Sequence, residues 1–225
     1  MKNNLWFNEV LEKNKNKYAS ELTWHQKAFE NRKGTPSNSW YERHFTKNFG
    51  LDKSFFTDKR LLDVGCGPLG SLEWADNAKL RIGLDPLANE YMKIGASELN
   101  MTFVLSPAEK IPFPDDYFDV ISSFNSIDHV DDVDKVILEI KRVCKTGGTF
   151  LLITDIHEKP TVNEPQHIGW DFPSKFTDVF DINLHLELEK CIPTNMYLSV
   201  EKEVPFDHAK MDSRYGILKC KMTKK

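Results

Sequence analysis

The chain has few cysteines and lacks a long apolar run. Its four cysteines are far apart and none belongs to a Cys-x-x-Cys pair, so neither a zinc site nor a disulfide framework is indicated. No segment approaches the roughly 18 apolar residues of a membrane span, and residues 1–7 lack the apolar core of a signal peptide. With 30 basic against 34 acidic residues, the net charge of −4 gives no broad attraction to nucleic acid or anionic membrane. We expect a cytoplasmic protein; the oligomeric state is not indicated.

A glycine-rich turn follows an apolar strand expected over residues 60–64. Gly65, Gly67 and Gly70 stand at G-x-G-x-x-G spacing before an expected helix, and glycine lets the backbone approach a ligand closely. Any tight strand-to-helix turn also favours glycine. However, the next apolar segment ends at Asp85, 18 residues beyond Gly67, close to the roughly 20 typical of a carboxylate that binds a ribose diol. The pattern indicates an adenosine-type cofactor, and a length of 225 residues favours S-adenosylmethionine over a nicotinamide dinucleotide, whose enzymes normally add a second half-sheet or domain.

Alternating apolar segments predict an α/β fold with a mostly parallel sheet covered on both faces. We expect strands near residues 60–64, 80–85, 101–105, 118–124, 149–154, 184–189 and 214–222. An amphipathic helix is expected to begin after Asp132 and to stop at Gly147. Residues 1–57 contain too little apolar material for a core of their own, so they should form a helical cap on a cofactor-binding domain of residues 58–225, within one domain overall.

Four motifs, in order along residues 58–155, carry a family resemblance. They are Asp63–Pro68, Gly83–Pro86, Ala108–Asp115 with Phe118–Val120, and Glu139–Val143 with Gly147–Gly148. The chain resembles the class I S-adenosylmethionine-dependent methyltransferases, in particular the small-molecule branch with ubiquinone-type and sugar-tailoring enzymes. The resemblance implies a Rossmann-like fold with a seven-stranded sheet whose last strand is antiparallel. It also implies methyl transfer from S-adenosylmethionine to an oxygen or nitrogen of a small polar metabolite, such as a sugar or tailoring intermediate. The alternatives are a non-catalytic protein that binds S-adenosylmethionine or S-adenosylhomocysteine, and a nicotinamide-dependent oxidoreductase.

Each part of the cofactor needs a different partner. Asp63 can accept from the ammonium directly or through water, unless it only caps a helix, and Asp85 can accept from the ribose diol. The resembled pattern usually supplies an acidic or amide side chain for adenine where this chain has Pro107, so the Ala108 amide, Glu109 or nearby carbonyls should replace it. The expected cofactor-binding residues are Asp63, Gly65, Cys66, Gly67, Pro68, Gly70, Asp85, Pro86, Pro107, Ala108, Glu109, Phe124 and Asn125.

The loop after the strand near 118–124 should line the acceptor site, because ligands of open α/β sheets bind beyond the carboxyl ends of strands. It contains Ser126-Ile127-Asp128 rather than the Pro-Pro-aromatic sequence of enzymes that methylate base amino groups, which argues against a nucleic-acid substrate. A histidine near its usual pKa of about 6.5 suits proton removal from a hydroxyl acceptor. We predict a catalytic set of His129 or His167 as base with Asp128, although a loop histidine can also simply face solvent.

The acceptor pocket or lid is predicted from polar and aromatic side chains outside the motifs. These are Trp24, His25, Trp40, His44 and His157, for which packing on the sheet is the alternative. No metal is expected: Asp155, His157, Glu164 and His167 offer suitable ligands, but the polarity of a surface loop explains them equally well.

Overall fold

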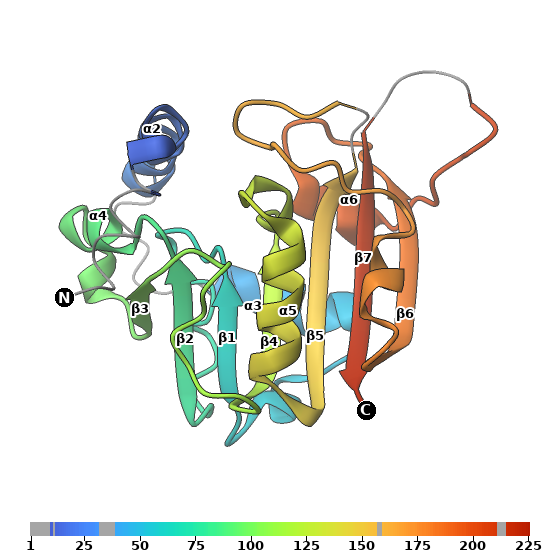
Figure 1. Cartoon of the computed structure of the whole chain (residues 1–225), viewed down its shortest axis with the longest axis horizontal. Helices are drawn as coiled ribbons and strands as arrows, with labels where there is room; N and C mark the ends of the chain where they lie inside the picture. Colours follow the sequence, from blue (N-terminus) through green and yellow to red (C-terminus); the bar gives the residue numbers. More distant parts are fainter. Residues whose placement is uncertain (1–9, 11, 32–38, 157–158, 211–214) are drawn as a thin grey trace.

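The computed structural model describes residues 10, 12–31, 39–156, 159–210 and 215–225. Seven strands form one sheet in the order β3-β2-β1-β4-β5-β7-β6 (Figure 1). They are β1 (Arg60–Val64), β2 (Leu80–Asp85), β3 (Thr102–Leu105), β4 (Phe118–Phe124), β5 (Cys144–Ile156), β6 (Phe180–Glu189) and β7 (Gly216–Lys224). Strands β1 to β5 pair in parallel, whereas β7 is antiparallel to both β5 and β6. The predicted mostly parallel, seven-stranded, Rossmann-like sheet is therefore confirmed.

Both faces of the sheet are covered by a hydrophobic core. Successive strand residues point to opposite faces, so neighbouring residues of one strand enter different cores. In β1, Leu61 belongs to one hydrophobic core and Leu62 to the other, and Leu151 and Leu152 of β5 divide in the same way. The described α-helices are α2 (Lys15–Glu30), α3 (Glu42–Phe45), α4 (Ala88–Lys93), α5 (Val133–Val143) and α6 (Met196–Lys202). The described 3-10 helices are η1 (Ser39–Tyr41), η2 (Lys47–Phe49), η3 (Lys53–Phe56), η4 (Ala96–Glu98), η5 (Ile127–His129) and η6 (Phe172–Phe176). Helices α5 and η6 cover the Leu62 face; α6 and the segment from η1 to η3 cover the Leu61 face.

Two local predictions are wrong. The expected helix after Gly70 does not form: residues 65–79, all described, contain turns and no helix. Gly70 has a φ of +69°, and only nine residues separate it from β2, which leaves little length for a helix. The second wrong prediction is the end of helix α5, which lies at Val143 rather than near Gly147. Strand β5 already begins at Cys144, which pairs with Phe118 of β4. The pairing of the two strands is irregular after that and becomes regular at Thr149.

The N-terminal region has two different locations. The segment from η1 to η3 packs Phe45, Phe49 and Phe56 into the core on the Leu61 face. Helix α2 instead lies at the end of the sheet toward which β1 and β2 run (Figure 1), where Tyr18 packs with Leu87 and Tyr91. The division of the chain at residue 57 stays a prediction. Within the described ranges, no helix has both the length and the apolar character needed to cross a bilayer.

Candidate functional site

A cavity of about 440 Å³ lies where the parallel strands end. Most of its wall comes from residues at or just after the ends of β1, β2, β3 and β4, at positions 64–69, 84–86, 107–109, 124–126 and 129–131. Helix α2 and residues of the C-terminal third complete the wall. This is the position at which ligands bind in open α/β sheets.

Glycines shape the cavity wall after β1. Gly65 and Gly67 have φ angles of +73° and +58°, in the left-handed region that side chains rarely adopt. A Cβ on Gly65 would lie 2.3 Å from the Cβ of Ser126, whose hydroxyl donates to the Val64 carbonyl at 2.7 Å. A Cβ on Gly67 would lie 3.2 Å from Cε1 of His25. The turn is thus held closely between the loop after β4 and α2, with its backbone on the cavity.

Asp85 ends β2 and faces this turn. Its Oδ2 accepts from the Gly67 amide at 3.1 Å and its Oδ1 from the Leu87 amide at 2.9 Å. Burial raises the pKa of Asp85 to about 6, and the two amide donors oppose that rise. Because each carboxylate oxygen can accept a further hydrogen bond, Asp85 is suited to two adjacent hydroxyls such as a ribose diol.

The predicted adenine segment lies on the same cavity. Pro107, Ala108 and Glu109 all contribute to the wall. Glu109 Oε1, however, accepts from the amides of Asp131 and Asp132 at 2.7 and 3.0 Å, so this oxygen holds the loop before α5. Of the predicted adenine partners, the backbone at Ala108 is therefore favoured over Glu109.

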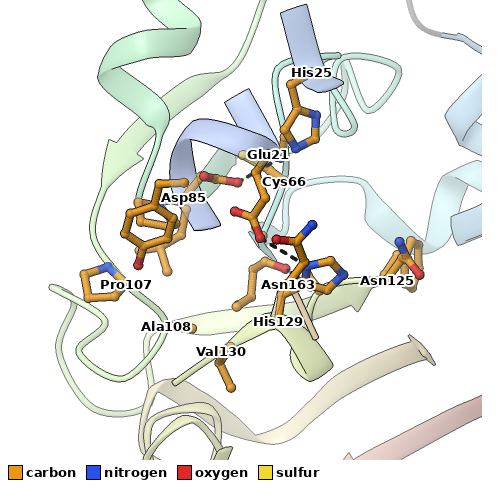
Figure 2. A pocket seen from close by; sticks show the side chains of 18 of the residues that line it. Glu21, His25, Cys66, Asp85, Pro107, Ala108, Asn125, His129, Val130 and Asn163 are labelled. Carbon is orange, nitrogen blue, oxygen red and sulfur yellow. Dashed lines mark hydrogen bonds and ion pairs between the residues drawn. The ribbon is translucent and has the colours of Figure 1, made fainter. Parts of the chain in front are cut away.

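Helix α2 adds a stripe of side chains at helical spacing. Lys17, Tyr18, Glu21, Trp24 and His25 all line the cavity. Figure 2 shows Glu21 and His25 projecting from the helix into the cavity. Burial lowers the pKa of His25 to about 4, so its imidazole is neutral at physiological pH. The helix thus brings both acidic and neutral polar groups opposite the glycine turn.

His129, in η5 after β4, has a carboxylate near each nitrogen of its ring. Its Nδ1 lies 3.2 Å from Glu21 Oε1, as the dashed line in Figure 2 marks, and its Nε2 lies 4.0 Å from Asp128 Oδ1. Lys17 also donates to the His129 carbonyl. Burial alone would lower the pKa of His129, but the hydrogen bond with Glu21 and the charges of Asp128, Glu21 and Glu164 outweigh it and raise the pKa. Its Nε2 is buried and has no hydrogen-bond partner among the described residues.

The structure brings most predicted site residues to the cavity. Those that line it are Gly65, Cys66, Gly67, Pro68, Asp85, Pro86, Pro107, Ala108, Glu109, Phe124, Asn125, His129, Trp24 and His25. His157 lies outside the described residues. The roles assigned to these side chains stay predictions.

Six predicted residues do not line the cavity. Asp63 is buried because its side chain points toward the Leu61 face, where it accepts from Ser71 and from Ser122 at 2.6 Å; direct contact with an ammonium in the cavity is therefore not what the structure shows. Gly70 lies beyond the turn, and Asp128 is fully buried behind His129. His167 is exposed outside the wall, which removes the geometric basis for its role as base.

The remaining two, Trp40 and His44, pack beneath the cavity as aromatic supports. The rings of Trp40 and His44 are 4.3 Å apart, and His44 lies 4.6 Å from the ring of Tyr197, which does line the cavity. His44 is fully buried, and this burial lowers its pKa to about 4. For this pair, the packing alternative describes the structure better than a lid.

Several cavity residues were missed by the sequence analysis. They are Lys17, Tyr18, Ser20, Glu21, Tyr41, Tyr91, Asn163 and Tyr197, among others. Glu164, which also lines the cavity, had been considered only as a possible metal ligand. The α2 residues had a detectable signal, since positions 17, 18, 21, 24 and 25 recur at helical spacing. Tyr197 had none, because it reaches the cavity from α6 through tertiary packing.

Comparison with known proteins points to one family. A family profile described as a methyltransferase domain matches residues 62–152. The uncharacterized methyltransferase YcgJ of Bacillus subtilis is 30% identical over 144 residues, which cover 56% of each chain. The ubiquinone/menaquinone biosynthesis C-methyltransferase UbiE of Vibrio parahaemolyticus is 38% identical over 110 residues, covering 42% of this chain and 40% of that protein. Residues 62–152 therefore form a methyltransferase domain of the class I S-adenosylmethionine-dependent type.

The fold agrees with this family. The structure of a putative S-adenosylmethionine-dependent methyltransferase from Listeria monocytogenes superposes with a TM-score of 0.58 at 16% identity, covering 84% of this chain and all of that one. The cofactor of the family is S-adenosylmethionine; in this cavity Asp85 would take its ribose diol and the backbone of the glycine turn would approach its methionine part. The matched segments span about half or less of the curated relatives' lengths.

Proposed function

We propose that the protein transfers the methyl group of S-adenosylmethionine to an oxygen or nitrogen of a small polar metabolite. The observation that carries the proposal is one continuous cavity with two chemically different parts. One part has Asp85, the glycine turn and Ala108, which suit the cofactor; the other has Glu21, His129 and further polar residues, which suit an acceptor. Its predicted location in the cytoplasm and its action on small molecules rather than nucleic acids are part of the proposal.

The polar part supports an acceptor that carries a hydroxyl or an amine. His129, Asn163 and Asn125, all labelled in Figure 2, line the cavity and offer polar groups to such an acceptor. Methyl transfer forms a bond from the acceptor atom to the methyl carbon and breaks the carbon–sulfur bond of the sulfonium, leaving neutral S-adenosylhomocysteine. The protein must align the two reactants, and the proton of the acceptor leaves to His129 or to solvent.

Carbon methylation is a second candidate, because the UbiE relatives from several bacteria are named C-methyltransferases. One experiment separates the candidates: S-adenosylhomocysteine release is measured over a panel of sugars, phenols, amines and carboxylic acids, with S-adenosylmethionine carrying a carbon-13 methyl. The chemical shift of the labelled methyl in the product then identifies the methylated atom. Tight cofactor binding without release for any acceptor class would support the non-catalytic alternative and contradict the proposal.

A further inference from the structure

Asp128, His129 and Glu164 form a compact cluster at the acceptor part of the cavity. One potential ligand atom from each lies within 4.8 Å of the other two. Divalent cations bind protein ligands at about 2.0 to 2.6 Å, so ligands on opposite sides of one ion lie about 4 to 5 Å apart. The three side chains are therefore already close to the separation that one ion requires.

The imidazole of His129 is oriented as in a metal ligand. Glu21 binds Nδ1 at 3.2 Å, which in the neutral ring places the proton on Nδ1 and leaves the lone pair on Nε2. That Nε2 is buried, has no hydrogen-bond partner among the described residues, and lies 4.0 Å from Asp128 Oδ1. A carboxylate on the second ring nitrogen is the usual arrangement that fixes the tautomer of a metal-bound histidine.

The local charge also favours a cation. Around the ring of His129, Glu21 Oε1 lies 3.2 Å from Nδ1, Asp128 Oδ1 lies 4.0 Å from Nε2, and Glu164 belongs to the same cluster. Lys17, on the same wall, interacts with the His129 carbonyl and Asp131. Carboxylates gathered in a partly buried site attract a cation.

We propose that Asp128, His129 and Glu164 bind a divalent metal ion of the Mg²⁺ or Mn²⁺ class at the cavity wall. Carboxylates suit these ions and imidazole extends the set toward Mn²⁺. Glu21 is a positioning residue that holds the ring of His129. This ligand set differs from the possible metal ligands named in the sequence analysis. Among the described residues, Glu164 belongs to both sets and His167 does not belong to the cluster.

The ion would define an acceptor class, an extension that rests on the proposed function. Three protein ligands leave positions for an acceptor with two adjacent oxygens, such as a vicinal diol or a 2-hydroxy acid. A coordinated hydroxyl has a lowered pKa and loses its proton to solvent more easily. A metal and a proton cannot share the lone pair on Nε2, so His129 is then a ligand rather than the base.

The test measures Mn²⁺ binding to the full chain without acceptor or cofactor, by loss of the free Mn²⁺ electron paramagnetic resonance signal. We expect saturable binding of one ion per chain and nitrogen-14 couplings from His129. His129→Gln and Glu164→Gln should weaken binding at least tenfold and His129→Gln should remove the couplings. Glu21→Gln should weaken binding by about 10- to 100-fold. His167→Gln, an exposed histidine of the Glu164 loop, is the matched control and should bind as the wild type does.

Calorimetric titration with S-adenosylmethionine separates the two proposals. Cofactor binding in all four variants shows that they are folded and that the donor part is intact. Cofactor binding without saturable Mn²⁺ binding, or with Mn²⁺ binding that His129→Gln and Glu164→Gln leave unchanged, would overturn the metal site and leave the proposed function standing. Saturable Mn²⁺ binding without S-adenosylmethionine binding would overturn the proposed function and leave the metal site standing.

Discussion

The substitution Gly65→Ala tests whether the glycine turn is shaped by close approach to Ser126. Gly65 has a φ of +73°, and an added Cβ would lie 2.3 Å from Cβ and 2.7 Å from Oγ of Ser126. Gly147 is a matched control, because its φ is +75° and a Cβ there would have nothing within 4 Å. The two alanine variants therefore share the backbone strain and differ in the clash.

The expected magnitudes follow from that difference. An alanine in the left-handed region costs about 1–2 kcal/mol, which both variants should lose in free energy of unfolding. Overpacking adds about 1–3 kcal/mol to Gly65→Ala alone. Relief of the clash also displaces the turn that lines the cavity, so Gly65→Ala should bind S-adenosylmethionine at least about tenfold more weakly, or about 1.4 kcal/mol. Gly147→Ala should bind it normally.

Urea denaturation and calorimetric titration measure the two effects, and a second substitution isolates the clash. Ser126→Gly removes both clashing atoms, so Gly65→Ala in that background should cost only what Gly147→Ala costs. Equal stability losses for Gly65→Ala and Gly147→Ala in the wild-type background, together with equal cofactor affinity, would refute the reasoning.

Three further predictions follow from the buried carboxylates and from α2. Asp85→Asn removes the charged acceptor that faces the turn, so S-adenosylmethionine should bind about 10- to 100-fold more weakly by calorimetry; unchanged affinity would contradict the ribose role. Burial raises the pKa values of Asp63 and Asp85 to about 6 from the ordinary 3.8, so the folded state holds these protons longer than the unfolded chain, and the free energy of unfolding should fall as pH rises from 4 to 6. Urea titrations across that range should show the fall, and Asp63→Asn should make it shallower, whereas an equal slope would argue against the raised pKa. Lys17→Met removes the contacts of α2 with the His129 carbonyl and Asp131, so hydrogen exchange in α2 should accelerate while exchange in β4 stays constant.

The sheet was predictable from local pattern, because each parallel strand is a short apolar run and Asp85 follows one of them at a distinctive spacing. The absent helix after Gly70 was not predictable from the glycine spacing, which suits a turn with or without a helix behind it. Asp63 was misplaced because its position after an apolar run does not show which face of β1 it points to. The two serine hydroxyls that hold it come from Ser71 and from β4, a strand 59 residues away.

The acceptor part of the site was the hardest to predict from sequence, because tertiary packing brings its residues together. Glu21 and His129 are separated by 108 residues, and neither side chain by itself indicates the other. His129 and His167 looked equivalent in sequence, since both follow strands in polar loops. Only the packing of α2 over η5 distinguishes them.

The matched family segment, residues 62–152, supplies the strand ends and the glycine turn but not Glu21, Glu164 or Tyr197. Of the groups proposed for the acceptor, the matched segment includes Asp128 and His129 but neither Glu21 nor Glu164. Under the proposed function, a change confined to the residue 163–164 loop would alter the acceptor while Asp85, the glycine turn and the central sheet stay as they are.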